Sequence, residues 1–189
     1  MRHALRLIGA GLLSGVIAGA IAGGVGSRLA MFVIRLMNSS FNGQITHPNA
    51  EVGVITLDGT MALVVEGMFT GVLGGLLYLM VRRWVPGRGA TKGLAFGFIL
   101  LVLAGGAQMT GNYEYVRYVQ PAVSVTLFAV LFPLYGLIVS PLTEWLGAGT
   151  TSPPPNRLVR RAGYVVLGAL MVQGLGQDLG VLQEFHIIG

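Results

Sequence analysis

Long apolar runs constrain this chain more than any other feature of its sequence. Of its 189 residues, 53% are hydrophobic and only 10% are charged, and the charges collect in short stretches between the apolar runs. A helix needs about 20 apolar residues to cross a hydrocarbon core of roughly 30 Å, because each residue rises about 1.5 Å. Five segments meet or approach this length. The sequence therefore predicts an integral membrane protein and excludes an ordinary water-soluble domain.

The predicted fold is all-α: a bundle of about five transmembrane helices in one polytopic domain covering residues 1–189. Four helices are expected near residues 5–26, 59–81, 93–109 and 121–146. The first apolar run is longer than the core of a typical secretory signal, so we expect it to be retained, and its helix either ends near residue 26 or extends as far as residue 38. The fifth helix, near residues 162–182, meets Gln177 and Asp178, so it is either short, tilted, or extended with Asp178 near an interface.

The basic residues predict the orientation of the bundle, because Lys and Arg in short loops resist translocation. Nine of the 12 fall on one side of the predicted spans. These nine are Arg2, Arg6, Arg82, Arg83, Arg88, Lys92, Arg157, Arg160 and Arg161. With five spans, this split places the N-terminus in the cytoplasm and the C-terminus outside, and it predicts a multi-pass protein of the cell membrane.

Composition also excludes several classes of function. The net charge of +5 does not indicate nucleic-acid binding, because the arginines flank apolar spans as topology signals do. The chain has no cysteine, which excludes thiolate nucleophiles, disulfides and cysteine-held metals. The histidines fall in terminal or loop segments, and no nucleotide-binding, hydrolase or metalloprotease motif is present. We therefore expect no cofactor, no metal site and no enzymatic activity.

Two ladders of glycine are the most specific pattern in the chain. Four-residue spacing places the glycines of a ladder on one face of a helix, and close backbone approach is what stabilises helix pairs in lipid. The two faces are expected either to pack together or to hold another chain, in a homo-oligomer or a larger complex. The first helix contributes Gly11, Gly15, Gly19 and Gly23, and the second contributes Gly67, Gly71 and Gly75.

Glu66 is the one unambiguous ionisable residue inside a predicted span, and such residues mark function by default. If the first helix continues past Gly26, Arg28 would lie opposite Glu66 on an antiparallel neighbour. The two would then form a structural ion pair, in which each charge offsets the other's lost hydration. Two alternatives stay open: a proton or cation site formed by Glu66 and Thr70, one turn away, or a polar tether to another subunit.

Three glutamines near the outer helix ends are the remaining polar candidates: Gln108, Gln173 and Gln177. Beside the fourth helix, which Pro133 and Pro141 are expected to bend, they could outline an outward-facing polar cavity. They could equally form a satisfied network of interhelical hydrogen bonds.

These patterns favour an accessory or structural membrane subunit that associates with other chains through its small-residue helix faces. The alternative is a small oligomeric transporter or channel that uses Glu66 as an intramembrane proton or cation site. The lipid bilayer is a partner in both interpretations, and other membrane chains or further copies of this chain are the expected protein partners.

Overall fold

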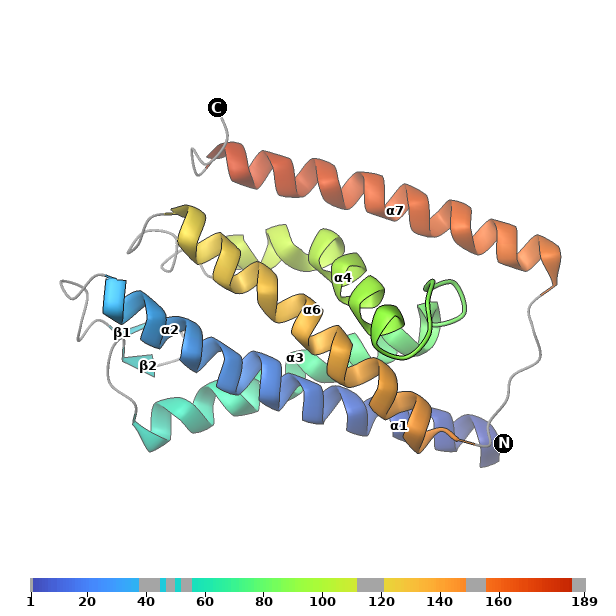
Figure 1. Cartoon of the computed structure of the whole chain (residues 1–189), viewed down its shortest axis with the longest axis horizontal. Helices are drawn as coiled ribbons and strands as arrows, with labels where there is room; N and C mark the ends of the chain where they lie inside the picture. The colour runs from blue at the N-terminus through green and yellow to red at the C-terminus, as the bar shows by residue number, and fades with distance from the viewer. Residues whose placement is uncertain are drawn as a thin grey trace.

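The computed structural model describes residues 2–37, 45–46, 50–51, 56–111, 121–148 and 156–184. The elements in chain order are α1 (Arg2–Ala18), the π-helix η1 (Gly19–Val25), α2 (Gly26–Met37), β1 (Ile45–Thr46), β2 (Ala50–Glu51), α3 (Leu57–Val81), α4 (Ala90–Gly111), α6 (Pro121–Leu146) and α7 (Arg157–Glu184). The two short strands pair antiparallel, with Ile45 opposite Glu51 and Thr46 opposite Ala50. The described residues otherwise form a helical bundle (Figure 1).

Five of these helices are long and apolar enough to cross a membrane, which confirms the predicted class. They cover Ala4–Val33, Leu57–Val81, Ala90–Thr110, Ala122–Leu146 and Arg157–Glu184. The last of them has 28 residues, or about 42 Å at helical rise, so it is long enough to span a core of roughly 30 Å. The chain is therefore a multi-pass membrane protein with an all-helical spanning domain.

The first span is one continuous helix that widens into a π segment in its middle. The backbone N–H of Gly26 donates to the carbonyl oxygen of Ile21, five residues earlier, and the π segment covers Gly19–Val25. The glycines of this segment have low α-helix propensity, and a π turn lets one additional residue face the neighbouring helix. Accordingly, the consecutive Gly23 and Gly24 both contact α3. Of the two lengths that the sequence left open for this helix, the structure has the longer one, which ends at Met37.

The glycine faces of the first helix and α3 lie against each other. A Cβ atom placed on Gly15 would lie 2.4 Å from the carbonyl oxygen of Gly71, and one on Gly19 would lie 2.0 Å from that of Gly67. A Cβ on Gly75 would likewise lie 2.3 Å from the carbonyl oxygen of Gly11. These distances are shorter than any ordinary contact, so only glycine permits the two backbones to come this close.

The spans lie side by side in the order α3, first helix, α6, α4, α7 (Figure 1). Glycine also sets the spacing between α4 and α6, which the sequence analysis did not anticipate. A Cβ on Gly136 would lie 2.2 Å from the carbonyl oxygen of Gly93, and one on Gly97 would lie 2.5 Å from the Cα of Pro133. The central core between these helices contains Tyr78, Phe96 and Val139, all at 0% exposure. The rings of Tyr78 and Phe96 meet edge to face at 4.9 Å.

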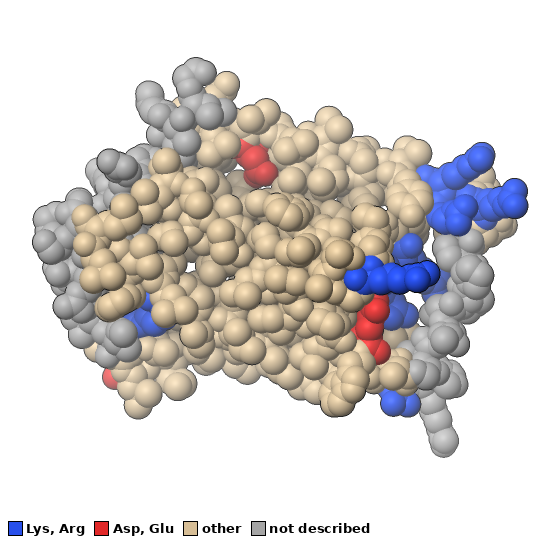
Figure 2. All heavy atoms as spheres, viewed as in Figure 1, with Lys and Arg blue, Asp and Glu red and all other residues tan. Residues whose placement is uncertain are grey.

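Basic side chains gather at one end of the bundle. Figure 2 shows Lys and Arg concentrated at the end where the N-terminus lies, beside the end of α6 and the start of α7. The described residues of the α3–α4 turn and of the α7 start, Arg82 to Lys92 and Arg157 to Arg161, supply most of this charge. The asymmetry agrees with the charge pattern of the sequence, and the assignment of this end to the cytoplasm stays a prediction.

Candidate functional site

Glu66 lies on the outer surface of α3, on the side away from the glycine face. Its side chain is exposed, whereas the adjacent Gly67 is buried against the first helix. Glu66 is nine residues beyond the start of α3 at Leu57, which places it about 14 Å along the helix axis. If the 25 residues of α3 are centred in a core of roughly 30 Å, the carboxyl lies well inside the hydrocarbon.

The surroundings of Glu66 are apolar apart from one hydroxyl. Phe69 and Leu73 are 73% and 68% exposed on the same side of α3. Thr70 is also exposed, and its hydroxyl donates back to the backbone, to the carbonyl oxygens of Glu66 and Gly67 at 3.1 and 3.2 Å. Among the residues whose side chains the structure describes, none forms a hydrogen bond or ion pair with the Glu66 carboxyl. This carboxyl therefore faces whatever surrounds the chain.

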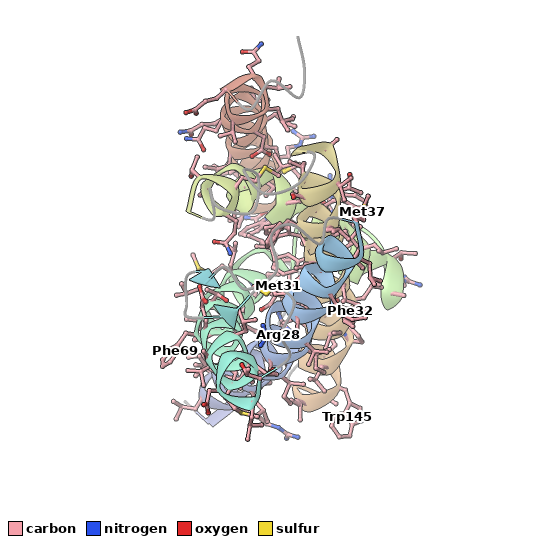
Figure 3. The ribbon with its side chains drawn as sticks, turned by 90° about the vertical axis from the view of Figure 1, so that its left-hand side faces the viewer. Arg28, Met31, Phe32, Met37, Phe69 and Trp145 are labelled. Atoms are coloured by element: carbon pink, nitrogen blue, oxygen red, sulfur yellow. The ribbon has the colours of Figure 1, made fainter. Side chains whose placement is uncertain are left out.

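The expected ion pair between Arg28 and Glu66 is not formed. Arg28 is 7% exposed, and its Nε donates to Thr60 Oγ1 at 3.2 Å. Its Nη2 donates to the carbonyl oxygen and the Oγ1 of Thr56, both at 3.5 Å. Figure 3 shows Arg28 between α2 and α3, close to Met31, whose sulfur accepts from Nη1 at 3.7 Å. Arg28 thus ties the first helix to the beginning of α3.

The register of the glycine contacts explains why the pair is absent. Gly19 packs against Gly67 and Gly71, and Gly23 packs against Gly67. Continuing this antiparallel register brings Arg28 level with Thr60, which is six residues and about 9 Å along the axis from Glu66. At the height of Glu66, the residues of the first helix that face α3 are Gly23 and Gly24. Glu66 points away from them.

The three glutamines do not join Glu66 in one site. Gln108 lies on α4, where it takes part in an interaction of its own, and Gln173 and Gln177 are exposed on α7. Beside them, the Asp178 carboxylate accepts a hydrogen bond of 2.7 Å from the backbone N–H of Gly106. This bond fastens α7 to α4. The sequence-predicted residues therefore divide into a set on the first helix and α3 and a separate set on α4 and α7.

A second polar group, at the basic end, was missed by the sequence analysis. The phenol of Tyr78 donates to Glu144 Oε1 at 2.9 Å and lies 2.8 Å from Ser140 Oγ. Because the phenol has one proton, Ser140 is the donor in the second bond. Lys92 forms an ion pair with the same Glu144 oxygen, and its Nζ lies 5.7 Å from the Tyr78 ring centroid.

This group joins α3, α4 and α6 at a single point, and its members satisfy one another. Two sequence signals could have revealed it. Ser140 and Glu144 are four residues apart and therefore share a face of their helix. Lys92 and Glu144 lie at helix ends that adjacent antiparallel spans bring together. The arrangement is that of an interhelical clamp, in contrast to the unpartnered carboxyl of Glu66.

Comparisons with protein-family models, with curated proteins and with solved structures find no match to this chain. The geometry of the described residues is therefore what supports a function.

Proposed function

We propose that this chain is an accessory or structural subunit of the cell membrane that binds another membrane-spanning chain, and that it performs no reaction itself. The observation that carries the proposal is the Glu66 carboxyl, which is exposed within a span and has no partner among the described side chains. The partner would dock on the face of α3 that bears Glu66.

The cost of exposing this carboxyl to lipid supports a partner. A charged side chain near the centre of a membrane helix costs roughly 2.5–3.5 kcal/mol on insertion scales, and the cost falls when another polar group offsets it. Within the chain, the Arg28 guanidinium donates its hydrogen bonds to Thr56 and Thr60 and does not reach Glu66. A partner helix that carries a lysine, an arginine or a hydrogen-bond donor at this depth would supply the missing group, while Phe69 and Leu73 would pack against its apolar residues.

The docking surface differs from the one that the sequence favoured. The small-residue faces of the first helix and α3 are filled by each other, so they are not free to hold a second protein. The outer face of α3 is on the opposite side of that contact. The proposed subunit thus uses its glycines for internal packing and Glu66 for recognition.

Transport is the second candidate, and Thr70, one helical turn from Glu66 on the same exposed side of α3, favours it. A carboxylate with an adjacent hydroxyl is a suitable proton or cation site. Because this face is exposed, another subunit would have to form the opposite wall of any pathway. In proteoliposomes of the purified chain, Glu66→Gln would then abolish proton- or cation-dependent uptake that the unaltered chain supports.

Native mass spectrometry of the gently extracted protein tests the accessory role. The unaltered chain should retain a second, different polypeptide at a fixed ratio, and Glu66→Leu should release it because the polar contact is lost. Without its partner, the Glu66→Leu chain should melt at the same temperature as the unaltered chain or higher, since it no longer exposes an unpaired carboxyl to the hydrocarbon. Met80→Leu is the matched control, because Met80 is 70% exposed near the other end of α3 and its replacement should leave the complex intact.

Two results would contradict the accessory role. One is an unaltered chain that is always extracted without another polypeptide, and the other is a Glu66→Leu complex as stable as the original. Loss of uptake in Glu66→Gln proteoliposomes, with no bound polypeptide in the native spectra, would favour transport instead.

A further inference from the structure

Two fully buried hydroxyl groups in the interior of the bundle have no hydrogen-bond partner among the residues that the structure describes. They belong to Ser14 of the first helix and Thr143 of α6, and both residues are at 0% exposure. A hydroxyl can donate one hydrogen bond and accept two. A buried polar group without a partner is costly in a bundle surrounded by lipid. A bound ligand that satisfies both hydroxyls would remove this cost.

The buried face of the first helix that contains Ser14 lies against α6 (Figure 1). Ala18 and Ala22 follow Ser14 at steps of four residues. Both belong to one core cluster with Tyr135 and Val139 of α6. Steps of four residues keep to one face of a helix. Ser14 therefore continues a face that packs on α6, whereas the adjacent glycine face packs on α3.

The register of the two helices brings Thr143 opposite Ser14. A Cβ atom on Gly26 would lie 2.7 Å from Leu131 Cδ2, which marks one level of the contact between the first helix and α6. The helices run antiparallel, with the N-terminus and the end of α6 at the same end of the bundle (Figure 1). Ser14 is 12 residues before Gly26, and Thr143 is 12 residues after Leu131. The two hydroxyls therefore lie at about the same level of one interface, and they do not bond to each other directly.

Other hydroxyls in these helices are satisfied by their own backbone. Thr70, Thr110 and Thr126 each donate to a carbonyl oxygen of the preceding turn, at 3.1, 3.1 and 2.7 Å. A helical threonine commonly satisfies its hydroxyl in this way without any neighbouring helix. Ser14 and Thr143 depart from this pattern. Their hydroxyls are therefore available to a group that lies between the first helix and α6.

The charges near the two hydroxyls favour a neutral ligand. The carboxylate next to Thr143 in the sequence is that of Glu144, which already pairs with Lys92 and accepts a hydrogen bond from Tyr78. A metal cation between the hydroxyls would therefore lack a compensating negative charge. A water molecule needs none, and it can accept a hydrogen bond from one hydroxyl while it donates to the other.

We infer that one water molecule binds between Ser14 Oγ and Thr143 Oγ1 and bridges the first helix to α6. Thr143 is one helical turn from Ser140, so the bridge extends the polar group around Tyr78 to a helix that its described hydrogen bonds do not reach. The first helix is then fixed by glycine contacts on α3 and by a polar bridge on α6. This inference does not depend on what covers Glu66.

A structure of the purified protein at a resolution that shows ordered water tests the bridge. We expect one density peak at about 2.5–3.0 Å from both Ser14 Oγ and Thr143 Oγ1. Thr143→Val keeps the shape of the side chain and removes the hydroxyl, so the peak should be absent in this variant. Thr126→Val is the matched control on α6, because the Thr126 hydroxyl donates to its own backbone, and it should leave the peak in place. A direct bond between the two hydroxyls, or no peak between them, would overturn the inference.

Unfolding equilibria in mixed detergent micelles provide a second test. With a bridging water, Ser14→Ala and Thr143→Val should each raise the unfolding equilibrium constant about five-fold, because each change removes one end of the bridge. The double variant should raise it by clearly less than the product of the two effects, because both changes break the same bridge.

Three results of the unfolding experiment would contradict the bridge. Single variants at least as stable as the unaltered chain would show that the hydroxyls had no ligand to lose. Strictly multiplicative effects in the double variant would show that Ser14 and Thr143 share no ligand. A melting temperature that rises with sodium chloride, but not with choline chloride at the same ionic strength, would identify a bound cation in place of water.

Discussion

Two tyrosines show how single polar atoms join the apolar helices of this bundle. The Tyr135 hydroxyl donates to the carbonyl oxygen of Gly71 at 2.6 Å, so it links α6 to α3. Tyr78 links the same two helices in the opposite sense, from α3 to Ser140 and Glu144 of α6. The phenol can reach this oxygen because Gly74 has no side chain: a Cβ atom there would lie 2.6 Å from the Tyr135 hydroxyl oxygen. Hydrogen bonds and not hydrophobic gain therefore specify this contact within lipid.

Replacing Tyr78 with phenylalanine tests the clamp at the basic end. The change keeps the ring against Phe96 and removes the hydroxyl, which leaves Ser140 and Glu144 without that partner. The free energy of unfolding should fall by about 1 kcal/mol, within the range measured for interhelical bonds in membranes. Unfolding in mixed detergent micelles measures it. Tyr164→Phe, at a half-exposed position, should have no effect, and an equal loss in both variants would argue against the clamp.

The helices themselves were largely predictable, and their contacts partly so. The number and class of spans followed from apolar length alone. The glycine ladders also indicate the approximate register of the first helix on α3. Pairing Gly15 with Gly71 and Gly19 with Gly67 would place Arg28 opposite Asp58, which is two residues from the observed partner Thr60 and eight from Glu66. The ion pair expected for Glu66 came instead from counting residues back from assumed helix ends, and helix ends are the least certain feature of a sequence.

Other contacts left too little trace in the sequence. Gly93 and Gly97 form a four-residue glycine pair on α4, but their counterpart on α6 is the single Gly136, so no matching ladder marks the partner. The π turn of Gly19–Val25 has no distinctive sequence pattern. The Tyr78 clamp joins residues 66 positions apart, Tyr78 and Glu144. No local sequence pattern predicts such a contact, because it depends on which helices lie next to each other in the bundle.

A matched pair of alanine variants on the first helix tests whether glycine contacts determine its packing. Gly19→Ala would place a methyl group 2.0 Å from the Gly67 carbonyl oxygen, whereas Gly9→Ala would meet nothing within 4 Å. Forcing the helices apart should lower the unfolding free energy by about 1–3 kcal/mol, measured as above. Gly9→Ala should be neutral or stabilising by up to about 1 kcal/mol, because alanine favours a helix more than glycine does. Equal stability of the two variants would contradict the proposed role of this contact.

At the scale of the whole molecule, the bundle has a closed interior and two distinct outer surfaces. Close glycine contacts and tyrosine hydrogen bonds hold the first helix, α3, α4 and α6 to one another. Among the described residues, Glu66 of α3 and Gln173 of α7 are exposed polar side chains without partners, and Ser14, Trp84 and Thr143 each bury a polar atom that has none either. We propose that the chain assembles with another chain through α3, and that Glu66 faces protein and not lipid.

Site-specific photo-cross-linking at Phe69 tests that claim most directly. Phe69 is 73% exposed and three residues from Glu66, so a photoreactive phenylalanine there reports what covers this face in the native membrane. We expect one discrete adduct with a different polypeptide, which disappears when Glu66→Leu is introduced. The same probe at Val172, which is 72% exposed on α7, should give lipid adducts. Lipid adducts alone at Phe69 would contradict the account.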